Sequence, residues 1–273
     1  MKEMRLGVFV KLTRDIDQQF ARLREHGFST CQLSTSNREL FTDEMAEAVL
    51  AAQQRHEVEI TALWCGWPGP GVWDFYEGPS SLGLVPAWCR AYRMEFLLLG
   101  SDFGRKIRVS DFITHVGFIP ENPLDVDYIG VVQAVRHVAR HCQQNGQFFL
   151  FETGQETPIT LKRTIQDVGL DNLGVNLDPA NLLLYGKGNP VDALDILGEY
   201  VRGVHLKDGE YPTDGRKLGQ EKPIGQGRVD FPALIAKLKQ LNYSGALTIE
   251  REIKGEQQIK DILAGKEFIE RLL

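Results

Sequence analysis

Four residues that can bind a metal stand at the ends of short apolar runs in the second half of the chain. The runs are QFFLFE, LGVNLD, VRGVH and GALTIE, and they end on Glu152, Asp178, His205 and Glu250. Three carboxylates and one imidazole make a ligand set that suits a divalent cation. If the four side chains meet, they require a cation, because clustered carboxylates repel each other strongly. The pattern therefore predicts one bound divalent metal ion.

The imidazole in this ligand set shifts the expected metal preference toward ions that accept nitrogen as well as oxygen ligands. We favour Mn²⁺, and Mg²⁺, Co²⁺, Zn²⁺ and Fe²⁺ are alternatives. Each ligand taken alone has an ordinary explanation, since acidic residues at strand ends often cap the next helix and a lone histidine is often structural. The placement of all four at successive strand ends is what favours a shared site.

The four apolar runs have the composition of buried parallel strands. Each is rich in β-branched and aromatic residues and is flanked by Gly, Pro or Asn. The first two intervals between ligands each have room for one helix and a return, and the third has room for an extra loop. Four further strands are expected over residues 4–10, 30–34, 58–65 and 111–118, with helical patterns such as 42–56 and 127–146 between strands.

Eight alternating strand and helix units predict an α/β fold, and closure into one (β/α)8 TIM barrel spanning 1–273 as a single domain. The formal charge of −6 and the absence of a dense Lys/Arg run argue against nucleic acid and acidic membrane surfaces as partners. The N-terminus lacks the pattern of a secretory signal, and no segment is long and apolar enough for a membrane span. Four scattered cysteines indicate neither a zinc site nor a disulfide framework, so a cytoplasmic location is expected.

The loop that follows the third expected strand is long, aromatic and rich in Gly and Pro. Its sequence is GWPGPGVWDFYEGPSS, and with the strand before it this region supplies Trp64, Trp67, Trp73 and Phe75. The rings could wall a pocket at the barrel mouth, cap the barrel core or form an oligomer contact, because an aromatic patch does not identify its partner. A homodimer is left open.

The motifs FETGQE, NLDPAN, VHLKDG, GQGRVDF and LTIERE occur in this order, and with them the chain resembles the xylose-isomerase-like barrels, specifically the sugar phosphate isomerase/epimerase group. This resemblance covers nearly the whole chain. It implies that Glu152, Asp178, His205 and Glu250 bind the metal, and that Glu152 and Glu250 also transfer protons. Relatives often carry a histidine where this chain has Asn181. The DNA-repair endonucleases of the superfamily use that histidine for zinc, so their trinuclear site is not expected.

The activity that the resemblance implies is proton transfer on a carbon next to a carbonyl, in a small-molecule carbohydrate. The outcome would be isomerisation or epimerisation. A metal-dependent lyase, such as an inosose dehydratase or an enzyme of keto-glycoside β-elimination, is the first alternative, and a non-catalytic sugar-binding barrel is the second. A nuclease is disfavoured by the acidic balance and by Asn181.

Six further residues near these strand ends are candidates for substrate binding, and most have a structural alternative. The alternatives are a structural hydrogen bond for the histidine, helix capping for the pair after Glu152, pairing with Asp208 for the lysine, and a surface position beside Asp230 for the arginine. The asparagine could bind a sugar hydroxyl but lacks imidazole basicity. In chain order the candidates are His115, Gln155, Glu156, Asn181, Lys207 and Arg228. His137 and His141 are spaced for metal binding but are expected on a solvated helix face.

Overall fold

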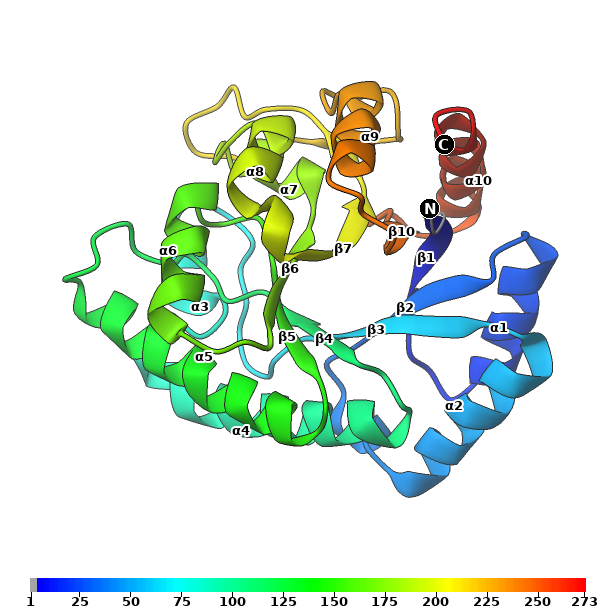
Figure 1. The fold of residues 1–273 in the computed structure, drawn as a ribbon, viewed down its shortest axis with the longest axis horizontal. Coiled ribbons are helices and arrows are strands. Elements are labelled where there is room, and N and C mark those ends of the chain that lie inside the picture. The colour runs from blue at the N-terminus through cyan, green and yellow to red at the C-terminus, as the bar shows by residue number, and fades with distance from the viewer. Residues whose placement is uncertain (1–3) are drawn as a thin grey trace.

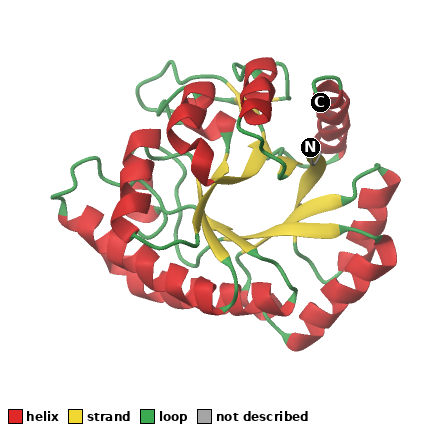
Figure 2. Cartoon of the chain, in the orientation of Figure 1, coloured by secondary structure: helices red, strands yellow, loops and turns green. Residues whose placement is uncertain are grey.

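The structure is a computed structural model that describes residues 4–273, so the first three residues of the expected 1–273 domain lie outside the described residues. Eight strands form a closed barrel in which each strand pairs in parallel with both neighbours (Figures 1 and 2). In barrel order they are β1 (Arg5–Lys11), β2 (Thr30–Thr35), β3 (Glu59–Cys65), β4 (Asp111–Thr114), β5 (Phe148–Glu152), β6 (Leu173–Leu177), β7 (Val201–Leu206) and β10 (Ala246–Ile249).

Helices follow the strands along the chain and surround the barrel, as the red ring around the yellow strands in Figure 2 shows. They are α1 (Ile16–Glu25), α2 (Asp43–His56), α4 (Ala87–Lys106), α5 (Val126–Gln144), α6 (Pro158–Val168), α8 (Pro190–Leu197), α9 (Phe231–Gln240) and α10 (Glu256–Glu270). The prediction of one (β/α)8 barrel is confirmed. No helix among residues 4–273 has both the length and the apolar character needed to cross a membrane.

Local sequence signals set many of the helix boundaries. The Thr42 hydroxyl accepts a hydrogen bond from the Met45 N–H at 3.1 Å and caps α2. Thr157 caps α6 in the same way through the Thr160 N–H, and this helix ends at Gly169, whose φ of 64° suits glycine. The Thr42 cap explains why the start of α2, which was expected over 42–56, could be predicted to within one residue.

Alternate residues of the strands face opposite sides of the barrel wall. Leu63, Phe112 and Phe149 belong to the large apolar cluster shared with the helices. The residues one position away, Ala62, Ile113 and Leu150, form a separate small cluster. Because side chains alternate across a strand, this second cluster lies inside the barrel. Burial of each such leucine or phenylalanine side chain stabilises the fold by about 1.5–3 kcal/mol.

Several short elements in the connecting loops were not expected. They are α3 (Gly78–Ser81), α7 (Pro179–Leu184), the two-stranded antiparallel sheet of β8 (Asp208–Gly209) and β9 (Glu221–Lys222), and the 3₁₀ turns η1 (Arg38–Leu40) and η2 (Gly198–Tyr200). The sheet lies in the long interval between His205 and Glu250, where the sequence left room for an extra loop.

The fourth strand is shorter than the expected 111–118, because β4 ends at Thr114. Beyond it the backbone pairs with the aromatic loop instead of a neighbouring strand, and the Leu84 N–H donates to the Val116 carbonyl at 2.8 Å. Gly117 follows with a φ of 98°, and a Cβ there would lie 2.3 Å from the Leu82 carbonyl oxygen. This close approach places His115 just past the strand end, under the aromatic loop.

Candidate functional site

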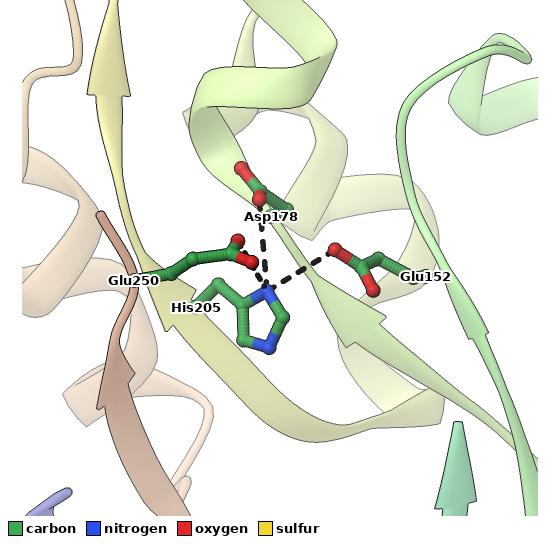
Figure 3. Close-up of side chains that lie close together, drawn as sticks. All are labelled: Glu152, Asp178, His205 and Glu250. Atoms are coloured by element: carbon green, nitrogen blue, oxygen red, sulfur yellow. Dashed lines mark ion pairs between the residues drawn. The ribbon is translucent and has the colours of Figure 1, made fainter. Parts of the chain in front are cut away.

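The four predicted ligands meet at one end of the barrel (Figure 3). Glu152 is the last residue of β5, His205 lies near the end of β7, and Asp178 and Glu250 directly follow β6 and β10. All four side chains are buried, and one candidate ligand atom from each lies within 4.8 Å of the others. The four residues that the sequence pattern selected as ligands therefore lie side by side in the fold.

The His205 imidazole is at the centre of this cluster. Its Nδ1 lies 3.1 Å from Glu152 Oε1, 3.2 Å from Glu250 Oε2 and 3.6 Å from Asp178 Oδ2. Burial lowers the pKa of His205, but the Glu152 and Glu250 carboxylates outweigh it and hold this pKa well above its ordinary value. In the metal-free protein the imidazole therefore carries a positive charge that faces the three carboxylates.

Three atoms of the cluster support a metal ion as the natural occupant. Asp178 Oδ2, His205 Nδ1 and Glu250 Oε2 are all buried, and none has a hydrogen-bond partner among the described residues. Buried polar atoms are normally satisfied, and leaving one unpaired costs about 1–3 kcal/mol. The atoms that lack a hydrogen bond are the ones that converge, and carboxylate oxygens with an imidazole nitrogen suit a divalent cation. The residues present therefore fit such an ion.

Lys207 brings a buried positive charge to the same cluster. Its Nζ lies 3.4 Å from Glu250 Oε2 and 3.7 Å from Asp178 Oδ2, and it donates to Glu252 Oε1 at 2.5 Å. Burial lowers the pKa of Lys207, while Glu250 and Glu252 raise it, and the result is a pKa well above the ordinary value. The lysine does not pair with Asp208, which accepts backbone N–H groups of the β7–α9 loop instead.

Asn181, in α7, connects the lysine to the first glutamate. Its Oδ1 accepts from Lys207 Nζ at 3.2 Å, and its Nδ2 lies 3.5 Å from Glu152 Oε1. An amide can make both contacts because it has a donor and an acceptor on one group. Asn181 therefore lies in the cluster, in contact with a predicted ligand.

His115 and Trp64 contact the other side of Glu152. The Trp64 indole N–H donates to Glu152 Oε2, and His115 Nε2 lies 3.5 Å from Glu152 Oε1. His115 Nδ1 is buried without a partner. Trp73 packs against the same imidazole with ring centroids 5.1 Å apart, and Trp67 stacks on Trp73 at 5.9 Å. Three of the four predicted aromatic residues thus gather around His115, whereas Phe75 packs against Tyr185.

Gln155 and Glu156, which follow Glu152 in the chain, are also buried at the site. Gln155 is 1% exposed, and neither its amide oxygen nor its amide nitrogen has a partner among the described residues. Burial raises the pKa of Glu156 to about 8, which leaves this side chain neutral at pH 7. Neither residue caps α6, because Thr157 does so. The helix-capping alternative for this pair is therefore wrong.

Arg228 is the candidate that the structure does not bring to the cluster. It is exposed, and within residues 4–273 its guanidinium has no hydrogen bond or ion pair. Asp230, the suggested neighbour, caps α9 through the Ala233 N–H at 3.0 Å. The two histidines of the outer helix also lie elsewhere: His137 is exposed, and His141 Nε2 is 2.8 Å from Asp102 Oδ1.

Residues 20–272 match the model of the xylose isomerase-like TIM barrel family. The chain belongs to this family. A xylose isomerase domain protein from Planctomyces limnophilus is 33% identical, with a TM-score of 0.93 over 99% of this chain and 97% of that one. An uncharacterised protein of Methanocaldococcus jannaschii is 22% identical over 98% of this chain and 90% of its own length.

Relatives and neighbours whose names state a reaction are more distant or match only a segment. The Escherichia coli protein named "Putative L-ribulose-5-phosphate 3-epimerase SgbU" is 32% identical over 96 residues, which are 34% of this chain and 33% of that protein. D-psicose 3-epimerase from Clostridium cellulolyticum is 15% identical with a TM-score of 0.76, over 99% of each chain. A probable 3-DHS dehydratase from Bacillus anthracis is 16% identical with a TM-score of 0.72, over 97% and 99%. Solved structures that share this fold thus include sugar epimerases and a dehydratase.

Sequence reasoning missed two buried amides that approach the cluster from inside the barrel. Gln32 Oε1 lies 2.8 Å from His205 Nε2, and Gln32 Nε2 donates to Asn176 Oδ1 at 3.2 Å. The available signal was a glutamine in the otherwise small or apolar strand TCQLS and an asparagine in LGVNL. A polar residue in a buried strand requires a partner, and such partners cannot be identified from strand pattern alone.

Proposed function

We propose that this chain is a divalent-metal-dependent isomerase or epimerase that acts on a sugar or sugar derivative. The observation that carries the proposal is the position of two buried glutamates, Glu152 and Glu250, which flank His205 Nδ1 from different strands (Figure 3). Glu152, Asp178, His205 and Glu250 would hold the ion, for which Mn²⁺ is our choice. The sugar epimerases among the neighbours support the same reaction class.

Proton transfer on a carbon next to a carbonyl accounts for this arrangement. A divalent cation, when bound, supplies positive charge that stabilises the negative charge developing on the substrate oxygens. One glutamate takes the proton from the carbon, and the other returns a proton from the opposite side, which inverts the stereocentre. Return of the proton to the adjacent carbon instead shifts the carbonyl and gives an isomer.

The neighbouring groups prepare these glutamates for proton transfer. The Trp64 indole N–H holds one oxygen of Glu152, so the carboxylate has a fixed orientation. Glu250 is buried beside the Lys207 ammonium, and although burial raises its pKa, Lys207 and His205 hold the pKa below its ordinary value. Glu250 is therefore ionised in the metal-free protein and is available as a ligand or as a base.

The groups that line the cluster have the chemistry to orient a polyhydroxyl substrate. His115 and Gln155 have buried polar atoms without partners, and the Asn181 amide and the Lys207 ammonium lie beside the ligands. Sugar hydroxyls can satisfy such atoms, and the ring of Trp73 offers an apolar face beside His115. We propose that His115, Gln155, Glu156, Asn181 and Lys207 contact the substrate. Arg228 would contact it at the rim of the site.

A metal-dependent lyase is the alternative that one further feature favours. Elimination requires stabilisation of the negative charge that develops on the leaving oxygen, and the Lys207 ammonium is a buried cation beside Glu250 and Asp178. The dehydratase among the structural neighbours has the same fold. The first steps of both reactions are the same, so product identity distinguishes them.

Deuterium incorporation tests the proposal. The Mn²⁺-loaded protein is incubated in D₂O with a panel of ketoses, inososes and keto-glycosides, and label is sought at the carbon beside the carbonyl. We expect label and an epimer or isomer for at least one compound, and loss of label by at least 100-fold in Glu250→Gln. Label with an unsaturated product would establish the lyase instead.

Metal analysis and a matched variant complete this test. Glu256 is exposed in the first turn of α10, so Glu256→Gln changes the same functional group away from the cluster and should keep full exchange. Absence of any bound divalent ion after incubation with Mn²⁺ would instead support a non-catalytic sugar-binding barrel. Exchange that persists in Glu250→Gln would remove Glu250 from the mechanism.

A further inference from the structure

Gln32 contacts the His205 imidazole from the opposite wall of the barrel. Gln32 is 1% exposed in β2, which is not a neighbour of β7 in the barrel (Figure 1). The contact between the two side chains therefore crosses the barrel interior. The two joined atoms, Gln32 Oε1 and His205 Nε2, are 2.8 Å apart. An amide oxygen only accepts hydrogen bonds, so Nε2 must carry the proton in this arrangement.

This proton position determines what the other ring nitrogen can do. With the proton on Nε2, the neutral imidazole has its lone pair on Nδ1, the atom that faces Glu152, Glu250 and Asp178. A metal-bound His205 and a doubly protonated His205 both need an acceptor at Nε2. Gln32 Oε1 supplies this acceptor in either state, and no other hydrogen-bond partner for Nε2 exists among residues 4–273.

A second amide accepts the other end of Gln32 in this arrangement. Asn176, fully buried in β6, accepts from Gln32 Nε2 at 3.2 Å, which leaves Oε1 toward His205. Gly203 makes room for this pair, because a Cβ there would lie 2.4 Å from Asn176 Oδ1. Gln32 and Asn176, in the space that Gly203 leaves, thus hold the imidazole at Nε2. This is the ring nitrogen that Glu152, Asp178 and Glu250 do not contact.

We propose that Gln32, oriented by Asn176, is a positioning residue that fixes His205 with its proton on Nε2 and thereby sets the affinity of the site for its divalent ion. The inference rests on the proposed metal-dependent function. Partners that orient a metal-binding histidine typically contribute 10- to 100-fold to metal affinity. Without the acceptor, the buried Nε2–H loses its partner, and the ring can take the tautomer whose Nδ1 cannot bind the ion.

Titration of Mn²⁺ into three variants tests this role. Gln32→Met has a similar shape without the acceptor, and we expect its affinity for Mn²⁺ to be about 10- to 100-fold lower than that of the wild type. Gln32→Glu keeps an acceptor oxygen, so its affinity should remain within about threefold of the wild type or become tighter. Gln143→Met alters an exposed glutamine of α5 and is the control for the substitution itself.

The tautomer can be observed directly by NMR with ring-labelled ¹⁵N-histidine, in the Zn²⁺-loaded protein. The His205 signals are identified by their absence in His205→Gln. We expect a protonated Nε2 and an unprotonated Nδ1 in the wild type, and a change of this pattern in Gln32→Met. The wild-type measurement needs no variant, so the proposal stays testable even if Gln32→Met does not fold.

The outcomes separate this inference from the function on which it rests. If the wild type binds neither Mn²⁺ nor Zn²⁺, the proposed metal-dependent function fails. If the wild type binds Mn²⁺ and Gln32→Met binds it equally well, only the role of Gln32 is removed. A proton on Nδ1 in the Zn²⁺-loaded wild type would also overturn the inference. Weaker binding by both Gln32→Met and Gln143→Met would show that Gln32 has no special role.

Discussion

At the scale of single residues, the two carboxylate oxygens of Asp178 have different roles. Oδ1 accepts the Asn181 N–H at 2.8 Å and caps α7, whereas Oδ2 has no hydrogen bond and faces His205 Nδ1 and Lys207 Nζ. In the sequence, helix capping and metal binding were competing explanations for an acid at this strand end. The structure shows that one side chain can do the first and remain available for the second.

This division of work predicts different effects for two substitutions at Asp178. Asp178→Asn keeps an oxygen for the cap but removes the charged ligand, so Mn²⁺ affinity should fall by about 100-fold while the fold is retained. Asp178→Ala should lose the cap as well and cost about 1 kcal/mol more in the free energy of unfolding. Mn²⁺ titration and urea unfolding measure the two effects. Full affinity in Asp178→Asn would exclude Oδ2 as a ligand.

The raised pKa of Glu156 predicts a dependence of stability on pH. Burial raises this pKa to about 8 in the folded chain, from an ordinary value of 4.5. The folded state therefore holds a proton that the unfolded state releases between about pH 4.5 and 8. Stability from this group is fully present below about pH 4.5 and declines as pH rises through this window, by up to about 1.4 kcal/mol per pH unit.

Urea unfolding of Glu156→Gln between pH 5 and 9 checks this prediction. An uncharged side chain of the same shape should make the unfolding free energy less dependent on pH, and the variant should be more stable than the wild type above pH 8. Glu121→Gln, at an exposed glutamate, should leave the pH profile unchanged. If the unfolding free energies of the wild type and of Glu156→Gln changed with pH in the same way between pH 5 and 8, this would contradict the raised pKa of Glu156.

At the scale of elements, the aromatic loop between β3 and α4 is held by one buried arginine. The Arg93 guanidinium, from α4, donates to the carbonyl groups of Pro68, Pro70, Ser81 and Gly83. It also lies 4.2 Å from the centroid of the Trp67 ring, whose N–H donates to the His115 carbonyl at 3.1 Å. The position of the loop over His115 therefore depends on a residue outside the site.

Replacement of Arg93 should destabilise this loop and the substrate site with it. Arg93→Leu leaves four carbonyl groups without their donor, and we expect a loss of about 3 kcal/mol or more in the free energy of unfolding. Arg93→Lys should lose less, because an ammonium group can satisfy some of the four. Mn²⁺ affinity should stay within about threefold in both, since Arg93 does not contact the ligands. A variant as stable as the wild type would refute the role of Arg93.

The sequence predicted the long elements better than the short ones. Eight strands and their helices follow from apolar periodicity and from caps such as Thr42 and Thr157. The β8–β9 sheet was not predictable in this way, because β9 is held by distant contacts such as the Glu252 N–H on the Glu221 carboxylate. The same distinction applies within the site. Ligands at strand ends have a pattern, whereas the contact of Lys207 with Glu252 is set by tertiary structure alone.

At the scale of the whole molecule, the barrel converts four separate strand ends into one site. The ligand-bearing strands β5, β6, β7 and β10 are consecutive neighbours, so their ends lie side by side at the same edge of the barrel (Figure 1). Gln32 reaches the cluster from β2, across the interior. A cation held by these strands therefore links half of the barrel wall, which makes metal binding a contribution to the stability of the fold as well as to chemistry.

This link predicts that the ion stabilises the whole chain. An ion that binds only the folded state adds RT ln(1 + [L]/Kd) to the free energy of unfolding, about 2.7 kcal/mol when free Mn²⁺ is at 100 times its Kd. For a chain of this size, that gain raises Tm by roughly 5–10 °C. We expect EDTA to reverse the shift and His205→Gln to show almost none. An equal shift in wild type and His205→Gln would place the stabilising ion elsewhere, because His205 Nδ1 is the atom on which the three carboxylates converge.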